Sequence, residues 1–206
     1  MRKIIKTCCF IFPLVAIFLS TNYPTIHAGA VGLQFEKEKI RIKISEDEYR
    51  LVGDYYFNNS DAKVIRQKIF YPIIKNLHLP FPHFFKVTNV LKNQTVSFTK
   101  AKNGISFWIE IPPFSKEIYR VEYHQKVLNK KLEYILTTTS KWGKPLKSAE
   151  FLIVISLNCE LEHISIPFDS ESEDSKTKSY FIHKKNFNPQ KNLIIEWRCE
   201  NDHKSN

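Results

Sequence analysis

The chain has 206 residues, with 31 Lys+Arg against 21 Asp+Glu, 43% hydrophobic residues, 14% aromatic residues and 4 Cys. A chain of this length forms one domain or two small ones, and its apolar content is sufficient for a buried core. This composition excludes a disordered protein, a collagen-like repeat and a disulfide-dense miniprotein. A polytopic membrane protein is excluded as well, because only one apolar stretch has a relevant length.

The first thirty residues have the pattern of a secretory signal peptide. Three basic residues lie within the first six, an apolar run extends from Cys8 to Leu19, and small residues follow at Ala28 and Ala30. The run of about 12 residues is shorter than the roughly 20 that a membrane-spanning helix needs. We expect a signal peptide over residues 1–30, cleaved after Ala28 or Ala30, with an uncleaved N-terminal anchor as the alternative.

Cleavage would change both the charge and the cysteine content of the chain. The formal net charge of +10 includes three positive charges and no acid from residues 1–30, so the mature chain carries about +7. Cys159 and Cys199 remain, and cysteines of exported proteins usually pair. We therefore predict a Cys159–Cys199 disulfide in a periplasmic or extracellular protein, with two buried, unpaired thiols as the alternative.

Alternating hydrophobicity predicts strands along most of the mature chain. Ile40, Ile42 and Ile44 alternate with basic residues, whereas Leu33 and Phe35 have the opposite parity. Both sets can face one core only if the chain bulges or turns between residues 36 and 39. Further along, Asn103-Gly104 supplies the turn chemistry of a tight hairpin between two alternating segments.

About nine or ten such strands, with no intervening helical segment, predict an all-β fold. We expect an antiparallel β-sandwich of immunoglobulin-like architecture. Residues 31–206 should form a single domain, because no Gly/Ser/Pro-rich linker divides them. The acidic, Ser-rich stretch near residues 169–178 is predicted to be a solvated loop between the last two strands.

Two segments resemble a known class of protein. Residues Tyr134–Phe151 contain a strand, a Trp142-Gly143 corner and a Pro-led strand, and residues Asn186–Trp197 contain an Asn-Phe-x-Pro turn before the last strand. The order of these elements resembles that found in secreted bacterial β-rich domains of uncharacterised function. The resemblance implies an exported all-β module and carries no catalytic residues.

Catalytic and metal-binding motifs are not evident in the sequence. It has no G-x-S-x-G elbow and no glycine-rich phosphate loop. His78 and His83 flank a proline-containing segment, without the spacing of a helical zinc pair, so they are interpreted as exposed or capping histidines. The acidic cluster near Asp169 lacks the pattern of an EF-hand loop. No cofactor and no metal site are therefore expected.

A basic, aromatic-containing region is the predicted binding surface. Lysines between residues 126 and 147 face a single acid, Glu133, and two aromatic residues are interleaved among them. An ordinary solvated rim is the alternative. An exported chain would use such a surface for an unknown protein or an anionic envelope component, not for nucleic acid. The residues of this surface are Lys126, Lys130, Lys131, Tyr134, Lys141, Trp142, Lys144 and Lys147.

A second unusual segment is Pro72 to Lys86, which combines three prolines with seven large apolar residues. Such a composition is too apolar for an ordinary loop. We interpret the segment as a cover over one end of the core, with an exposed apolar patch as the alternative.

These observations predict an exported, non-enzymatic β-sandwich that serves in binding or envelope interaction. Membrane contact would be peripheral or through an uncleaved signal. A secreted hydrolase whose carboxylates converge only in the fold is one alternative, because such pairs are not visible in a sequence. A membrane-tethered structural protein with an uncleaved N-terminal helix is the other.

Overall fold

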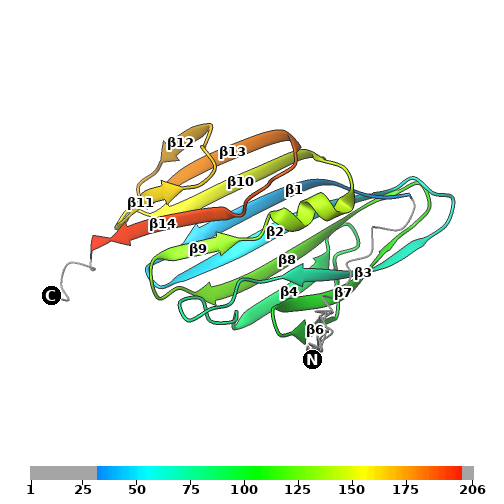
Figure 1. Cartoon of the computed structure of the whole chain (residues 1–206), viewed down its shortest axis with the longest axis horizontal. Helices are drawn as coiled ribbons and strands as arrows, with labels where there is room; N and C mark the ends of the chain where they lie inside the picture. Colours follow the sequence, from blue (N-terminus) through cyan, green and yellow to red (C-terminus); the bar gives the residue numbers. More distant parts are fainter. Residues whose placement is uncertain (1–31, 201–206) are drawn as a thin grey trace, which may run out of the picture.

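A computed structural model describes residues 32–200 of the protein (Figure 1). The predicted signal peptide therefore lies outside the described residues. The elements are β1 (Leu33–Ile44), β2 (Glu48–Asn59), β3 (Ile65–Pro72), β4 (Phe84–Asn89), β5 (Gln94–Thr95), β6 (Phe98–Ala101), β7 (Gly104–Ile111), β8 (Lys116–Lys126), β9 (Lys131–Tyr134), the 3-10 helix η1 (Thr137–Trp142), β10 (Leu146–Ser156), β11 (Cys159–Ile164), β12 (Ser170–Glu173), β13 (Thr177–Phe187) and β14 (Leu193–Cys199).

The strands form one large sheet and two small ones. The large sheet has eight strands in the order β12-β13-β10-β1-β2-β8-β4-β5, and β1 runs parallel to β10. The small sheets have three strands each, β11-β14-β9 and β3-β7-β6. Tyr55 of β2 bonds to a residue of each small sheet, so both cover the same face of the large sheet. The result is a two-layer arrangement in which the second layer is divided.

The all-β prediction is confirmed, and its details are corrected. The described residues contain fourteen strands in place of nine or ten, and the short helix η1 was not predicted. The divided second layer also differs from the two continuous sheets of the expected immunoglobulin-like sandwich. Short strands were missed because tertiary pairing creates them: all four side chains of β12 are exposed, so its sequence carries no alternation.

The acidic segment predicted as a loop contains this edge strand. β12 pairs with β13 from Ser170 to Glu173, and the chain then turns at Asp174. Asp174 Oδ1 accepts the backbone N–H groups of Lys176 and Thr177, at 2.8 Å each. The segment precedes β13, so it does not lie between the last two strands as expected.

The two faces of the large sheet differ in character. On the covered face, the alternating isoleucines of β1 are buried beside the inward residues of β2, β8 and β10. On the opposite face, which we call the open face, charged side chains pair across strands. Glu150 contacts both Lys37 and Lys39 at 2.8 and 2.9 Å, and Arg120 contacts Asp54 at 2.7 Å. This division is the expected one for a sheet with a single covered face.

Two local predictions are confirmed. The register between β1 and β2 shifts between Phe35 and Lys37, which is the bulge that the change of parity requires. β6 and β7 form a hairpin closed at Gly104, where φ is +154°. A Cβ atom at Gly104 would lie 2.2 Å from the Tyr71 carbonyl oxygen, so only glycine fits this approach.

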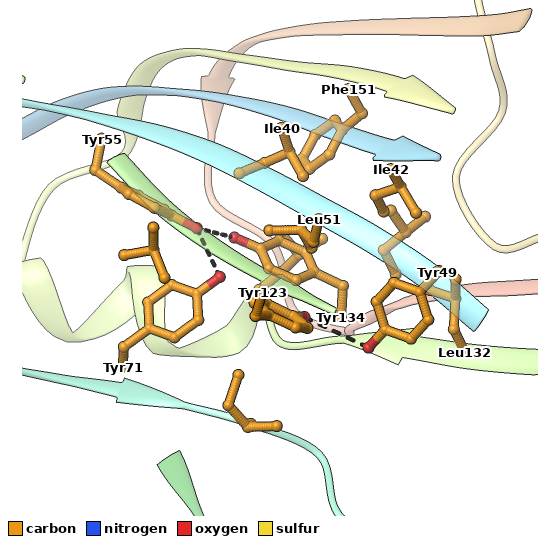
Figure 2. Close-up of a cluster of buried hydrophobic side chains, with 14 of the residues drawn as sticks. Ile40, Ile42, Tyr49, Leu51, Tyr55, Tyr71, Tyr123, Leu132, Tyr134 and Phe151 are labelled. Carbon is orange, nitrogen blue, oxygen red and sulfur yellow. Dashed lines mark hydrogen bonds between the residues drawn. The ribbon is translucent and has the colours of Figure 1, made fainter. Parts of the chain in front are cut away.

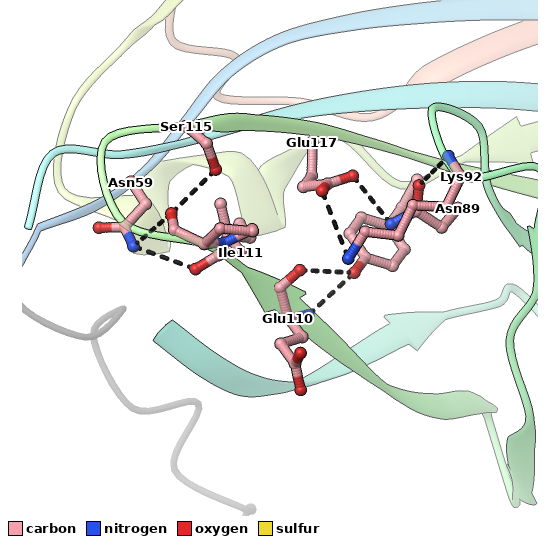
Figure 3. A network of polar contacts seen from close by, with 9 residues as sticks. Asn59, Asn89, Lys92, Glu110, Ile111, Ser115 and Glu117 are labelled. Carbon is pink, nitrogen blue, oxygen red and sulfur yellow. Dashed lines mark hydrogen bonds and ion pairs between the residues drawn. The ribbon is translucent and has the colours of Figure 1, made fainter. Parts of the chain in front are cut away.

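Buried polar groups attach the β3-β7-β6 sheet to the large sheet (Figure 3). The amide of Asn59 donates to the carbonyl oxygens of Ile111 and Pro112 at 3.1 and 2.9 Å. The Tyr119 hydroxyl accepts the N–H of Glu110 at 2.8 Å and donates to its carbonyl at 3.1 Å. A buried polar group without a hydrogen-bond partner costs free energy. These hydrogen bonds therefore help to fix the position of β7 relative to β2 and β8.

The apolar segment Pro72–Lys86 packs onto the core, as the cover interpretation expects. Ile73 and Leu79 are buried, although Leu77 is exposed. The fully buried Gln125 holds this segment, because its amide donates to the carbonyls of Ile74 and Pro80 at 2.9 Å each. The irregular backbone of the segment thus finds hydrogen-bond partners in the large sheet.

The predicted disulfide is present. Cys159 and Cys199 are bonded, and they are directly opposite each other in the antiparallel pair β11–β14. Both side chains are buried. The bond therefore links two neighbouring strands of one small sheet and closes a chain separation of 40 residues.

Removing this bond should destabilise the protein. We expect the double variant Cys159→Ser/Cys199→Ser to lose about 3–4 kcal/mol of unfolding free energy, because the unfolded chain regains the entropy of an open loop. Urea unfolding of both proteins measures the difference. Adding a reductant should lower the midpoint of the wild type toward that of the variant, and equal stability of the two oxidised proteins would contradict the expectation.

Candidate functional site

A cavity of about 100 Å³ lies where the two small sheets part above the large sheet. Its floor comes from β1 and β2, one side from β3 and β7, and the other side from β9 and η1. Figure 1 shows η1 directly after β9 and in front of the large sheet. The cavity therefore depends on the division of the second layer, since one continuous sheet would cover this floor.

Three tyrosine hydroxyls meet beside the cavity (Figure 2). The Tyr55 hydroxyl lies between those of Tyr71 and Tyr134, at 2.8 and 2.9 Å. Burial raises the pKa of all three well above the ordinary value. The three groups therefore remain neutral and can act as hydrogen-bond donors and acceptors at any physiological pH.

Gly53 makes room for the central hydroxyl. A Cβ atom at Gly53 would lie 2.4 Å from the Tyr55 hydroxyl oxygen, which is closer than any real contact of this kind. The ring of Tyr55 thus passes over a residue without a side chain, two positions earlier on its own strand. This is how a tyrosine of the large sheet reaches both small sheets at once.

Glu38 is the carboxyl group of the cavity. It lines the cavity, is only 2% exposed, and pairs with Tyr55 across β1 and β2. Burial raises its pKa to about 8. Its Oε1 atom has no hydrogen-bond partner among the described residues. A buried oxygen without a partner is energetically costly, and such groups are often kept for binding or chemistry.

Aromatic rings form the wall next to this carboxyl. Phe35 and Phe57 stack at 5.3 Å between ring centroids, and Trp142 of η1 lies 5.6 Å from each of them. All three line the cavity. The exposed residues Lys68 and Lys141 also belong to its lining, so they mark its opening to solvent. The site thus combines an apolar wall with one buried carboxyl, which is typical of small-molecule sites.

The predicted basic surface is only partly assembled. Tyr134 is buried by the alternation of β9 and does not face solvent, which corrects its assignment to a surface. Trp142 is half-buried and belongs to the cavity wall.

Several lysines of that surface already have partners. Lys131 pairs with Glu196 at 2.6 Å, Lys147 pairs with Glu36, and Lys130 donates to the Glu46 carbonyl at 2.6 Å. The remaining three are exposed: Lys126, Lys141 and Lys144. A binding role for this region stays a prediction.

Glu38, Tyr55 and Tyr71 were not among the site residues predicted from the sequence. A signal for Glu38 was present, because it has the same parity in β1 as the buried Ile40 and Ile42. A charged residue on the apolar face of a strand is rare unless it has a function or a partner. Tyr55 and Tyr71 had no such signal, since buried tyrosines are common in β cores.

The structure also bears on the hydrolase alternative. That alternative requires two carboxyl groups on either side of a cleft. Glu38 is the one carboxyl-bearing residue among the described residues that line the cavity. The cavity therefore lacks the pair that this mechanism needs.

Comparisons with known proteins identify the fold. No protein-family model and no curated protein matches the chain. A candidate nutrient-binding protein from Legionella pneumophila has the same fold with a TM-score of 0.66 and 13% sequence identity, over 82% of this chain and 68% of that one. An M1 zinc metallopeptidase from Deinococcus radiodurans matches with a TM-score of 0.49 and 10% identity, over 82% of this chain and 43% of that one. Within residues 32–200, no helix is long and apolar enough to span a bilayer.

The raised pKa of Glu38 predicts how stability depends on pH. The folded state holds this proton up to about pH 8, whereas the unfolded state releases it near the ordinary value of 4.5. Stability should therefore fall as pH rises, by about 4 kcal/mol between about pH 5 and pH 8.5. Glu38→Gln should remove this decrease, and urea unfolding at both pH values measures it.

Glu36→Gln is the matched control for this experiment. Glu36 is the neighbouring acid of β1, but its pKa is lowered: burial opposes this shift, while Lys147 and Lys116 together outweigh it. The contribution of Glu36 to stability is lost only below its ordinary pKa. Above about pH 5, the unfolding free energy of the Glu36→Gln control should therefore fall with pH as steeply as that of the wild type. If the unfolding free energy of Glu38→Gln still fell with pH as it does in the wild type, the assignment of the pH effect to Glu38 would be wrong.

Proposed function

We propose that this chain is an exported, non-enzymatic module that binds a small ligand with an ammonium group and an apolar body. The observation that carries the proposal is the unpartnered Oε1 of Glu38 in a cavity walled by aromatic rings. The fold of this chain is similar to that of a candidate nutrient-binding protein, and this similarity agrees with a binding role.

The chemistry of the cavity favours a cation. An ammonium group would give Glu38 the hydrogen bond and the opposite charge that it lacks. The rings of Phe35, Phe57 and Trp142 line the same cavity, so they would cover the apolar body and add the attraction of aromatic quadrupoles for a cation. Lys68 and Lys141 are exposed and screened by solvent, so the buried carboxyl determines which charge is favourable inside.

Export is supported by the disulfide. Cys159 and Cys199 are paired, and such bonds persist mainly outside the reducing cytoplasm. A mature chain in the periplasm or outside the cell would meet ligands in free solution. The exposed lysines Lys126, Lys141 and Lys144 would then be available to an anionic envelope component.

Binding of n-butylamine tests the proposal, because its size suits a cavity of about 100 Å³. The amine stays protonated below about pH 10, and it requires the ionised form of Glu38. With a pKa of about 8 for Glu38, the affinity should rise about tenfold per pH unit up to pH 8 and then level off. Calorimetric or NMR titrations at several pH values measure the affinity.

The controls separate charge recognition from apolar binding. n-Butanol and pentanoate have the same butyl chain without the cation, so they should bind more weakly than the amine at about pH 8. Glu38→Gln should remove the pH dependence of amine binding. Equal affinity for amine and alcohol, or an unaltered pH profile in Glu38→Gln, would exclude the cation and with it the proposed ligand class.

A further inference from the structure

Two histidines and a glutamate from three parts of the chain meet at one end of the large sheet. Glu48 begins β2, His124 lies near the end of β8, and His83 directly precedes β4. Because β8 pairs with both β2 and β4, the sheet brings the three together. One potential ligand atom from each side chain lies within 4.8 Å of the others.

The arrangement is close to that of a metal site. Four ligands at about 2.1 Å from a tetrahedral ion are separated from one another by about 3.4 Å. In the structure, Nε2 of His83 lies 3.4 Å from Oε2 of Glu48, and Nδ1 of His124 lies 3.8 Å from Oε1 of Glu48. The backbone N–H of His83 donates to the carbonyl of His124 at 3.1 Å, which fixes the two histidines relative to each other.

A second carboxylate lies beside one of the histidines. Nε2 of His124 is buried, makes no hydrogen bond within the described residues, and lies 3.6 Å from Oε1 of Glu122. Arg50 holds that same oxygen at 2.7 Å. A metal-bound imidazole commonly directs its other N–H toward a carboxylate, which selects the tautomer. Nδ1 of His124 would bind the metal, and Nε2–H would face Glu122.

We propose that Glu48, His83 and His124 form a binding site for Zn²⁺ or a similar divalent transition metal. Two imidazoles and one carboxylate suit such ions, and three protein ligands leave a fourth position for water or a partner's side chain. Glu48 and His124 alternate with the buried Tyr49 and Tyr123, so they project from the open face of the large sheet. The site is therefore separate from the Glu38 cavity and independent of the proposed function.

The sequence alone did not indicate this site. His78 and His83 were the only close histidine pair in the sequence, and the structure leaves His78 outside the cluster. The partners of His83 lie 35 residues earlier and 41 residues later in the chain. Only the pairing of β8 with β2 and β4 makes them neighbours.

Titration of the mature chain with ZnCl₂ in a calorimeter tests the proposal. The wild type should bind one equivalent, and His83→Ala or His124→Ala should abolish this binding. Glu122→Gln retains all three ligands and should weaken it on the order of 10–100-fold through the orientation of His124. The control His163→Ala removes another exposed histidine and should bind as the wild type does.

Three further measurements keep the result decisive if a variant folds poorly. Glu48→Gln preserves the shape of the side chain and should also lose binding, and circular dichroism without metal establishes that each variant is folded. Co²⁺ in place of Zn²⁺ should give the visible absorption of a four-coordinate ion in the wild type. The proposal would be wrong if folded His83→Ala and Glu48→Gln bound zinc with unchanged affinity. It would also be wrong if His163→Ala lowered the zinc affinity as much as they do.

Discussion

The hydroxyl group of Tyr55 joins the three sheets of this protein. It comes from β2 in the large sheet and bonds to Tyr71 of β3 and Tyr134 of β9, one residue from each small sheet (Figure 2). Each hydroxyl is buried, so the loss of one partner would leave a polar group without compensation. The two hydrogen bonds therefore help to fix the position of each small sheet on the large sheet. These positions determine the gap between the two small sheets.

The cavity is a consequence of that gap. A tyrosine can reach both small sheets only because Gly53 leaves space under its hydroxyl. The same region holds Glu38, which pairs with Tyr55 across the strands and whose pKa is raised by burial. A core without function would gain stability from an apolar residue at position 38. The retained carboxyl is thus the physical reason to regard this cavity as a binding site.

The two faces of the large sheet support different chemistry. The covered face holds a buried, neutral carboxyl among aromatic rings, where electrostatic interactions are strong because water is excluded. The open face carries cross-strand ion pairs in contact with solvent, and the Glu48, His83 and His124 cluster lies at one end of it. The two proposed sites, one for an organic ligand and one for a metal, therefore lie on opposite faces of one sheet.

The sequence by itself determined the all-β class, the bulge after Phe35, the hairpin at Gly104 and the pairing of Cys159 with Cys199. These features follow from local alternation, from turn chemistry or from the presence of only two cysteines after residue 30. Tertiary structure alone decided that the second layer is divided, that Tyr134 faces inward and that Oε1 of Glu38 has no hydrogen-bond partner among residues 32–200. The reason is that strand order and the packing of one sheet on another depend on residues far apart in the chain, and a period of two residues specifies only which side of its own strand each residue takes.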